Sequence, residues 1–207
     1  MLTYEEMKDK LQNEMKPSRF AHTLGVVESA VALFEKYQDD TLTLEQVKTA
    51  ALLHDCAKNI SEEKLYKIAA AYGISDDPVM MGAPQLLHGP VGAVVAQMDY
   101  GIQDGDVLSA IACHTMGRMD MNTLEKIIYL ADYIEPGRSC PNVGNLRELA
   151  EKDLTLAVVA AMSNTIAYVA GEGLLIHPVT VAARNQLIMA LAAGESSESN
   201  ESNESNE

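Results

Sequence analysis

Apolar residues recur along most of the chain at steps of three and four, the spacing that places them on one face of an α-helix. The clearest stripe lies in residues 19–37, and Pro17 and Ser18 just before it are typical of a helix start. Its apolar positions are Phe20, Leu24, Val27, Val31 and Phe34. We find no sustained alternation of apolar and polar residues rich in β-branched side chains, the pattern of strands. The sequence therefore predicts an all-α protein.

Signals for helix starts repeat along the chain. Thr43–Gln46 is typical of a capping box, in which the first and fourth residues each bond the other's backbone N–H. Asn122–Glu125 and Asn145–Glu148 repeat this pattern with asparagine in first position. Ser61, followed by two glutamates, is expected to open a further helix, and Gly73 to end it.

The length suits a single domain. Of the 207 residues 47% are hydrophobic, enough to fill a core. None of the Gly/Pro breaks is long enough to separate two domains, so residues 1–194 are expected to form one domain. Residues 195–207 repeat Glu, Ser and Asn with nothing apolar to bury, and we expect them to be a disordered tail.

The charge is strongly negative. The chain has 15 Lys and Arg against 30 Asp and Glu, a formal net charge of −15. Five of the carboxylates lie in residues 195–207, which leaves −10 for residues 1–194. Binding to a nucleic-acid backbone or an anionic membrane surface needs clustered Lys and Arg, so neither partner is expected.

Other features favour the cytoplasm. No uninterrupted apolar stretch approaches the roughly 18 residues of a membrane span. Residues 1–10 have no hydrophobic core of a secretory signal. Cys56, Cys113 and Cys140 are odd in number and lack paired spacing, which suits a reducing compartment.

Several polar residues lie where a soluble helix normally places leucine. Asp132 follows Ile128 by four residues and Leu124 by eight, on the apolar face of its segment, and His54 follows Val47 and Ala50 on theirs. An ionised carboxylate in such a position costs several kcal/mol, as an order of magnitude, unless it is paired or bound to metal.

The histidines strengthen this point. Four of the five lie on or beside apolar helices, namely His22, His54, His88 and His114, with His88 at a helix entry. One such histidine alone is more often hydrogen-bonded to backbone than bound to metal. Taken together with Asp55 and Asp132, they favour a metal site with mixed nitrogen and oxygen ligands, the set that suits iron, manganese or zinc.

The order His22, His54-Asp55, Asp132 resembles the signature of HD-domain metal-dependent phosphohydrolases, and the inserted His88 and His114 resemble the subset that binds two metals. The flanking segments are similar to the bacterial YqeK-type family, symmetrical bis(5′-nucleosyl)-tetraphosphatases. These segments are Ser18–Thr23, Leu52–Lys58, His88–Gly92, His114-Thr115, Tyr129–Arg138 and Ile176–Pro178. The resemblance runs from about residue 5 to residue 190 and implies an HD-domain helical bundle.

The family also implies a division of labour among the ligands. His22, His54, Asp55 and Asp132 would hold one metal, usually described as iron. His88 and His114 would hold a second, with Asp55 bridging; manganese, cobalt and zinc are the alternatives. Two such cations would acidify a shared water to hydroxide, which would attack an internal phosphorus of diadenosine tetraphosphate and give two ADP molecules. Asp55 and Lys58 are the expected catalytic residues.

The substrate's charge requires cations near the ligands. Lys58 follows His54 by four residues, Arg19 precedes His22 by three, and Arg138 follows Asp132 by six, so all three are expected to contact phosphate. The direction of Arg118 cannot be read, because Gly117 intervenes. The family resemblance adds further contacts for the nucleotide: His88, Thr115, Asp132, Tyr133, Gly173, Leu174, Leu175, Ile176, His177 and Pro178. From the residues alone, Leu174–Ile176 is as readily core packing, and His177 a hydrogen-bonded loop histidine.

Three alternatives remain open at this stage. The chain could be an HD-domain nucleotidase or dNTP phosphohydrolase, a di-iron oxygenase of the same fold, or a non-catalytic nucleotide-binding module. The sequence does not distinguish a monomer from a homodimer.

Overall fold

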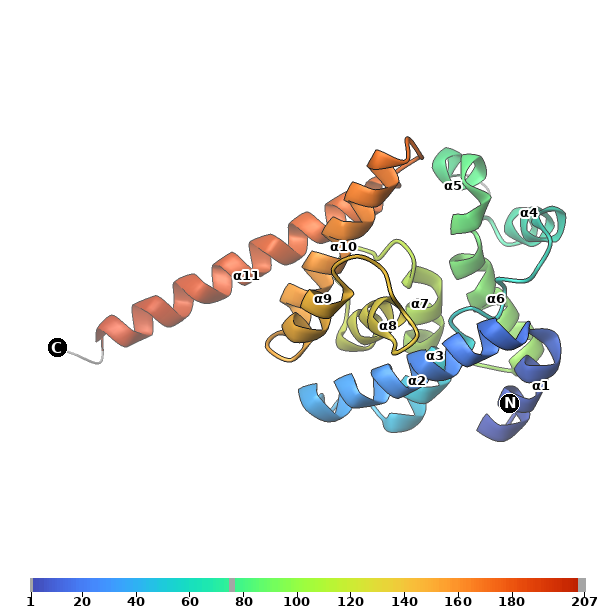
Figure 1. The fold of residues 1–207 in the computed structure, drawn as a ribbon, viewed down its shortest axis with the longest axis horizontal. Helices are drawn as coiled ribbons and strands as arrows, with labels where there is room; N and C mark the ends of the chain where they lie inside the picture. The colour runs from blue at the N-terminus through green and yellow to red at the C-terminus, as the bar shows by residue number, and fades with distance from the viewer. Residues whose placement is uncertain (1, 75–76, 205–207) are drawn as a thin grey trace.

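A computed structural model describes the backbone of residues 2–74 and 77–204, and side chains as far as Ala193. Every regular element in these ranges is helical, which confirms the all-α prediction (Figure 1). The elements are α1 (Tyr4–Glu14), α2 (Pro17–Tyr37), α3 (Leu44–Leu53), α4 (Glu62–Ala71), α5 (Pro78–Gly82), the 3₁₀ helix η1 (Pro84–Leu86), α6 (His88–Tyr100), α7 (Gly105–Cys113), α8 (Thr123–Ile134), α9 (Val143–Ala150), α10 (Leu154–Gly171) and α11 (Pro178–Glu204).

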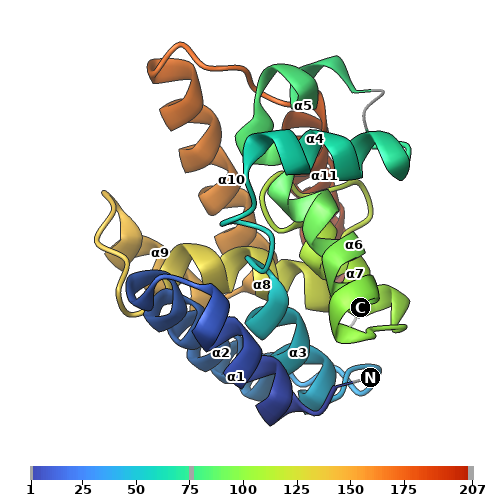
Figure 2. The same ribbon diagram turned by 90° about the vertical axis from the view of Figure 1, so that its right-hand side faces the viewer.

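Helix α8 lies at the centre of the bundle. It packs against α2, α3, α7, α9 and α10, and Figure 2 shows it crossing between α2 and α3 on one side and α10 on the other. Most of its residues are buried, including Leu124, Ile127, Ile128 and Leu130. A polar side chain on the inner face of this helix is therefore held in the middle of the molecule.

The helix starts predicted from capping residues agree with the structure, with one exception. Thr43 and Asn122 form complete capping boxes, and α4 begins after Ser61, although the Ser61 hydroxyl makes no capping bond. The predicted start at Asn145 is wrong, because α9 begins at Val143 after Asn142, whose φ is +66°. Burial of Leu146 and Ala150 fixes the register of α9 and places Asn145 inside its first turn.

The side chains of the predicted tail, residues 195–207, lie outside the described residues. Helix α11 is assigned as far as Glu204, the side chains after Ala193 lie outside the described residues, and so do residues 205–207 entirely. The disorder expected for residues 195–207 therefore stays a prediction.

Among the described residues, one helix has the length and composition of a membrane span, although the polar residues Ser163, Asn164 and Thr165 interrupt its apolar run. It is α10, with a mean hydropathy of 1.6 over 18 residues. Its buried residues, such as Val158, Ala161 and Met162, face the neighbouring helices α8, α9 and α11. A core helix of a soluble protein passes the same test, so α10 is weak evidence for a membrane.

Gly117 ends the turn that follows α7, and its replacement by alanine is expected to destabilise the protein. Its φ is +70°, and an added Cβ would lie 2.5 Å from Cε of buried Met162. We expect Gly117→Ala to lower the free energy of unfolding by about 1–3 kcal/mol, measured by urea denaturation. Gly171→Ala is the matched control, because nothing lies within 4 Å of its added Cβ and its φ is not positive. Equal stability of the two variants would contradict the prediction.

Candidate functional site

Six side chains from α2, α6, α8 and the turns after α3 and α7 meet near the C-terminal end of α8. His22 lies in α2 and Asp132 in α8, while His88 is the first residue of α6. His54 and His114 cap the C-terminal ends of α3 and α7, and Asp55 follows His54 directly. We refer to these residues as the His/Asp cluster: His22, His54, Asp55, His88, His114 and Asp132.

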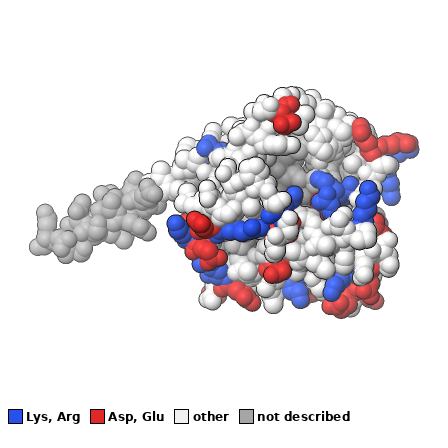
Figure 3. All heavy atoms as spheres, in the orientation of Figure 1, with Lys and Arg blue, Asp and Glu red and all other residues white. Residues whose placement is uncertain are grey.

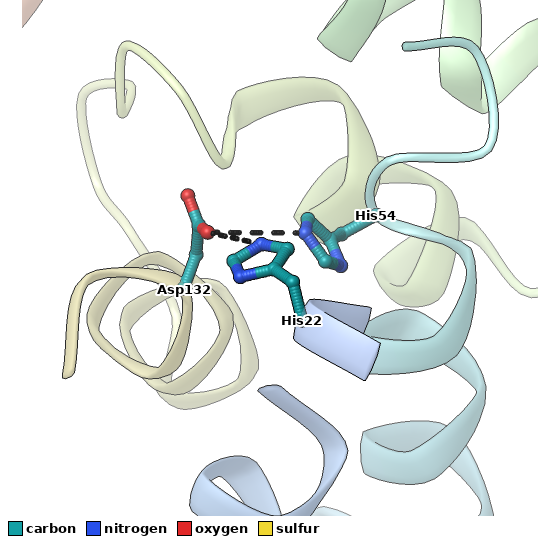
Figure 4. A group of neighbouring side chains, drawn as sticks. All are labelled: His22, His54 and Asp132. Atoms are coloured by element: carbon teal, nitrogen blue, oxygen red, sulfur yellow. Dashed lines mark ion pairs between the residues drawn. The ribbon is translucent and has the colours of Figure 1, made fainter. Parts of the chain in front are cut away.

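One half of the cluster surrounds Asp132 (Figure 4). Oδ1 of Asp132 lies 3.0 Å from Nε2 of His22 and 3.9 Å from Nε2 of His54. Oδ2 of Asp55 approaches the same two rings, at 4.0 Å from His22 and 3.6 Å from His54. Four ligand-type atoms, from α2, α8 and the turn after α3, therefore lie close together.

The other half of the cluster, His88 and His114, faces the second carboxylate oxygen of Asp55. Its Oδ1 is 3.2 Å from Nε2 of His88 and 3.6 Å from Nε2 of His114, and these two nitrogens are 3.1 Å apart. Asp55 thus presents one carboxylate oxygen to each pair of histidines.

Hydrogen bonds at Nδ1 aim all four Nε2 atoms into the cluster. Nδ1 of His54, His88 and His114 faces a backbone carbonyl at 2.5–2.7 Å, and Nδ1 of His22 faces a carboxylate oxygen of Glu135 at 3.0 Å. An oxygen acceptor there requires the proton on Nδ1, so Nε2 of the neutral ring carries a lone pair. Nε2 of His22 and of His54 are buried without a hydrogen-bond partner. Lone pairs directed at carboxylate oxygens require a cation between them, and these residues therefore fit a divalent metal.

The pKa values of these groups also favour positive charge within the cluster. Burial alone would raise the pKa of Asp55 and of Asp132, but the attraction of the surrounding imidazoles holds both pKa values well below the usual range. Burial would lower the pKa of His54, yet the neighbouring Asp55 and Asp132 raise it. Burial lowers the pKa of His88 to about 4, so this ring is neutral at pH 7.

Three of the predicted cations reach the cluster. Arg19 donates to Oδ2 of Asp55 at 2.8 Å and Arg138 to Oδ1 of Asp132 at 2.7 Å. Nζ of Lys58 lies 3.1 Å from Nε2 of His88, and burial lowers the pKa of this amine. Helix α3 ends before Lys58, and a turn closed by the bond from Lys58 N–H to the Asp55 carbonyl brings it back. Arg118 instead donates to buried Glu125 at 2.6 Å.

A cavity of about 690 Å³ opens beside the cluster. Its wall includes His114, Asp132 and Arg138 of the site, and also Thr115 and Tyr133, two of the nucleotide contacts that the family resemblance implies. The Thr115 hydroxyl is buried without a hydrogen-bond partner. Helix α10 supplies further residues that the sequence did not indicate: Asn164, Thr165, Ala167 and Tyr168. The sequence around these residues is largely apolar and uncharged, so it did not indicate a binding site.

The predicted contact segment Gly173–Pro178 does not line this cavity. It lies against α5, where Nε2 of His177 is 2.7 Å from Oδ2 of Asp77. Leu174 and Leu175 are about half exposed, and Leu175 packs beside Gly82. The structure therefore brings together the predicted metal ligands, the three cations, Thr115 and Tyr133, and leaves this segment apart from the cavity.

Comparison with known proteins agrees with this geometry. The model of the HD domain matches residues 19–137. This chain belongs to the HD-domain family. The match extends from α2 through the Pro-Gly turn after α8, and therefore contains all six residues of the cluster.

This chain is also similar to individual named proteins within the HD-domain family. It is 36% identical over 184 residues to a Bacillus subtilis protein named bis(5′-nucleosyl)-tetraphosphatase, symmetrical, covering 89% of this chain and 97% of the relative. A Halalkalibacterium halodurans protein of the same name is 39% identical over 171 residues, covering 83% and 89%. The family resemblance inferred from the motifs is thereby confirmed, and this chain belongs with these bacterial relatives.

A solved structure supports the fold independently. The crystal structure of a "predicted HD superfamily hydrolase involved in NAD metabolism" from Clostridium acetobutylicum matches with a TM-score of 0.87 and 41% identity. The match covers 92% of this chain and 99% of that one. The HD-domain bundle expected from the sequence is therefore confirmed.

Proposed function

We propose that this protein hydrolyses diadenosine tetraphosphate symmetrically and releases two ADP molecules. The observation that carries the proposal is the complete His/Asp cluster, with Nε2 atoms of His22 and His54 left unpaired in a buried, carboxylate-lined centre. The names of the relatives, symmetrical bis(5′-nucleosyl)-tetraphosphatases, supply the substrate.

The proposed cofactor is a pair of divalent metal ions, iron first, with manganese, cobalt and zinc as alternatives. His22, His54, Asp55 and Asp132 would hold one, and His88, His114 and Asp55 the other. The two carboxylate oxygens of Asp55, each facing a different pair of histidines, support a bridging role. Such ions supply an acidified water and positive charge for the phosphates when bound.

Three cationic side chains and the cavity would bind the parts of the substrate that lie away from the metals. Arg19, Lys58 and Arg138 surround the cluster and would neutralise the tetraphosphate oxygens that face away from the metals. The 690 Å³ cavity is apolar enough to take one nucleoside, with the Thr115 hydroxyl free to bond its polar groups. Thr115, Tyr133 and Arg138 are thus the contacts we favour.

The acidic charge of the chain is compatible with this substrate. On the face shown in Figure 3, Lys and Arg gather in a band across the middle of the molecule, while acidic side chains are dispersed around it. Positive charge concentrated at one site would accept a small polyphosphate, whereas a net charge of −15 disfavours long nucleic acids. A cytoplasmic monomer or homodimer without nucleic-acid or membrane partners completes the proposal.

The direct test is product analysis. Purified protein is incubated with diadenosine tetraphosphate and Fe(II) or Mn(II), and the nucleotides are separated by ion exchange. ADP as the sole product supports the proposal, whereas AMP with ATP would contradict symmetrical cleavage. Faster turnover of mononucleotides than of the dinucleotide would favour the nucleotidase alternative.

Tyr168 provides a test of the nucleoside cavity. It lines the cavity with 65% of its surface exposed, so its removal is expected to leave the fold intact. Stacking of a base on an aromatic ring contributes about 1–3 kcal/mol, so we expect Tyr168→Ala to raise KM about tenfold with kcat nearly unchanged. Tyr72→Ala is the matched control, an exposed tyrosine at the end of α4 and away from the cavity. Similar KM values for both variants would place the nucleoside elsewhere.

A further inference from the structure

Three of the four cluster histidines are oriented by their own preceding turn. Nδ1 of His54, His88 and His114 each bonds the carbonyl three residues earlier, of Ala51, Gln85 and Ile111. His54 and His114 follow the last residue of a helix, and His88 follows the 3₁₀ helix η1. Carbonyls at a helix end have no intrahelical partner, so they are free to accept from an imidazole.

His22 cannot use this arrangement. It lies inside α2, which runs from Pro17 to Tyr37, and carbonyls in a helix interior are already bonded to the N–H four residues later. Its Nδ1 therefore needs an acceptor from another element. That acceptor is the carboxylate of Glu135, the C-cap residue of α8, with Oε1 3.0 Å from Nδ1.

Glu135 is itself firmly held. Its exposed surface is only 4%, and its second oxygen, Oε2, accepts from the Gly137 N–H at 2.5 Å. The missing side chain of Gly25 makes room, because a Cβ there would lie 2.6 Å from Oε2. Arg147 of α9 donates to the backbone carbonyls of Ile134 and Glu135 at 2.9 and 2.7 Å. Contacts from α2 and the Pro-Gly turn thus hold the carboxylate, while α9 holds the backbone that carries it.

We propose that Glu135 is the positioning residue of His22, fixing the ring so that Nε2 donates to the metal shared with His54 and Asp132. The carboxylate holds the proton on Nδ1 and strengthens the donor character of Nε2, as an anionic partner does more than a carbonyl. This role rests on the metal-dependent function proposed above for the same cluster. It also explains why the turn after Asp132 contains glycine at position 137, where a Cβ would lie 3.0 Å from Oε2.

The test is metal binding without nucleotide. Metal-free wild type and Glu135→Gln are titrated with Co(II) in competition with a chelator of known affinity. A glutamine replaces one of the two carboxylate oxygens with an NH₂ group, which then faces either Nδ1–H of His22 or the Gly137 N–H and cannot accept from it. We expect the Co(II) affinity to fall about 10–100-fold and the visible absorption bands of bound Co(II) to shift, with an unchanged far-ultraviolet circular dichroism spectrum.

Glu125→Gln is the matched control. Glu125 is a fully buried glutamate of α8, and its hydrogen-bond partners Ser109, Arg118 and Asn122 lie outside the cluster. Its replacement is expected to lower thermal stability and leave Co(II) affinity and absorption unchanged. Wild-type Co(II) affinity in Glu135→Gln, or an equal loss in Glu125→Gln, would overturn the proposal.

A measurement on the unaltered protein covers the case in which Glu135→Gln does not fold. In Zn(II)-loaded wild type with ¹⁵N-labelled histidine, the Nδ1–H proton of His22 should resonate downfield of the three carbonyl-bonded Nδ1–H protons. Four equivalent shifts would overturn the role of Glu135. Normal metal binding in a protein that does not cleave the dinucleotide would refute the proposed function alone, because these measurements need no substrate.

Discussion

Asp55→Asn is expected to reduce kcat/KM for diadenosine tetraphosphate by at least roughly a thousandfold, about 4 kcal/mol of transition-state stabilisation. One oxygen of Asp55 faces His88 and His114, and the other faces His22 and His54. Asparagine has nearly the same shape, but one of these oxygens becomes an NH₂ group, which cannot bind a cation. The rate of ADP formation with saturating Mn(II), followed by ion exchange, measures the effect.

Substitution of a second aspartate, Asp104, is the control for the negative charge that Asp55→Asn removes. Asp104 caps α7 by accepting from the N–H groups of Asp106 and Val107, and asparagine is an equally good cap. Asp104→Asn is therefore expected to keep nearly full activity. If Asp55→Asn retained a tenth of the wild-type rate, Asp55 would not be a metal bridge.

Local signals predicted much of the fold, since a capping box or a helix stripe depends on residues within a few positions. Thr43 and Asn122 cap their helices as expected. At Asn145 the same local pattern failed, because the burial of Leu146 and Ala150 decides the register of α9. That burial depends on packing against α8 and α10, which no local pattern contains.

The cluster was predictable because Asp132 and His54 lie on apolar stripes, and because the order of all six ligands resembles the HD-domain signature. The residue that orients His22 could not be predicted, because Glu135 lies 113 positions away from it in the sequence. Glu135 entered the sequence analysis only as part of the segment Tyr129–Arg138 that carries the family resemblance, with no role of its own. The cavity wall from α10 was missed for a related reason: Asn164 and Tyr168 line the same cavity as Tyr133 only once α10 has packed against α8.

Removal of bound metal by a chelator is expected to lower the thermal midpoint of unfolding by about 5–11 °C. A ligand present at 100 times its Kd stabilises the folded state by about 2.7 kcal/mol, and each kcal/mol shifts the midpoint of a chain this long by roughly 2–4 °C. Without a cation, the unpaired Nε2 atoms of His22 and His54 remain directed at carboxylate oxygens in a buried centre. Differential scanning calorimetry of the Mn(II)-loaded and the chelator-treated protein measures the shift.

Two comparisons make this result specific to the cluster. Returning Mn(II) should restore the original midpoint, because the helices that carry the ligands pack through the apolar core without the metal. Asp55→Asn should respond to the chelator much less than the wild type does, since it lacks the carboxylate that joins the two pairs of histidines. An identical midpoint for loaded and stripped wild type would show that metal binding contributes nothing to the folded state. The demand for positive charge inferred from the unpaired imidazoles would then be met by protons on the histidines instead.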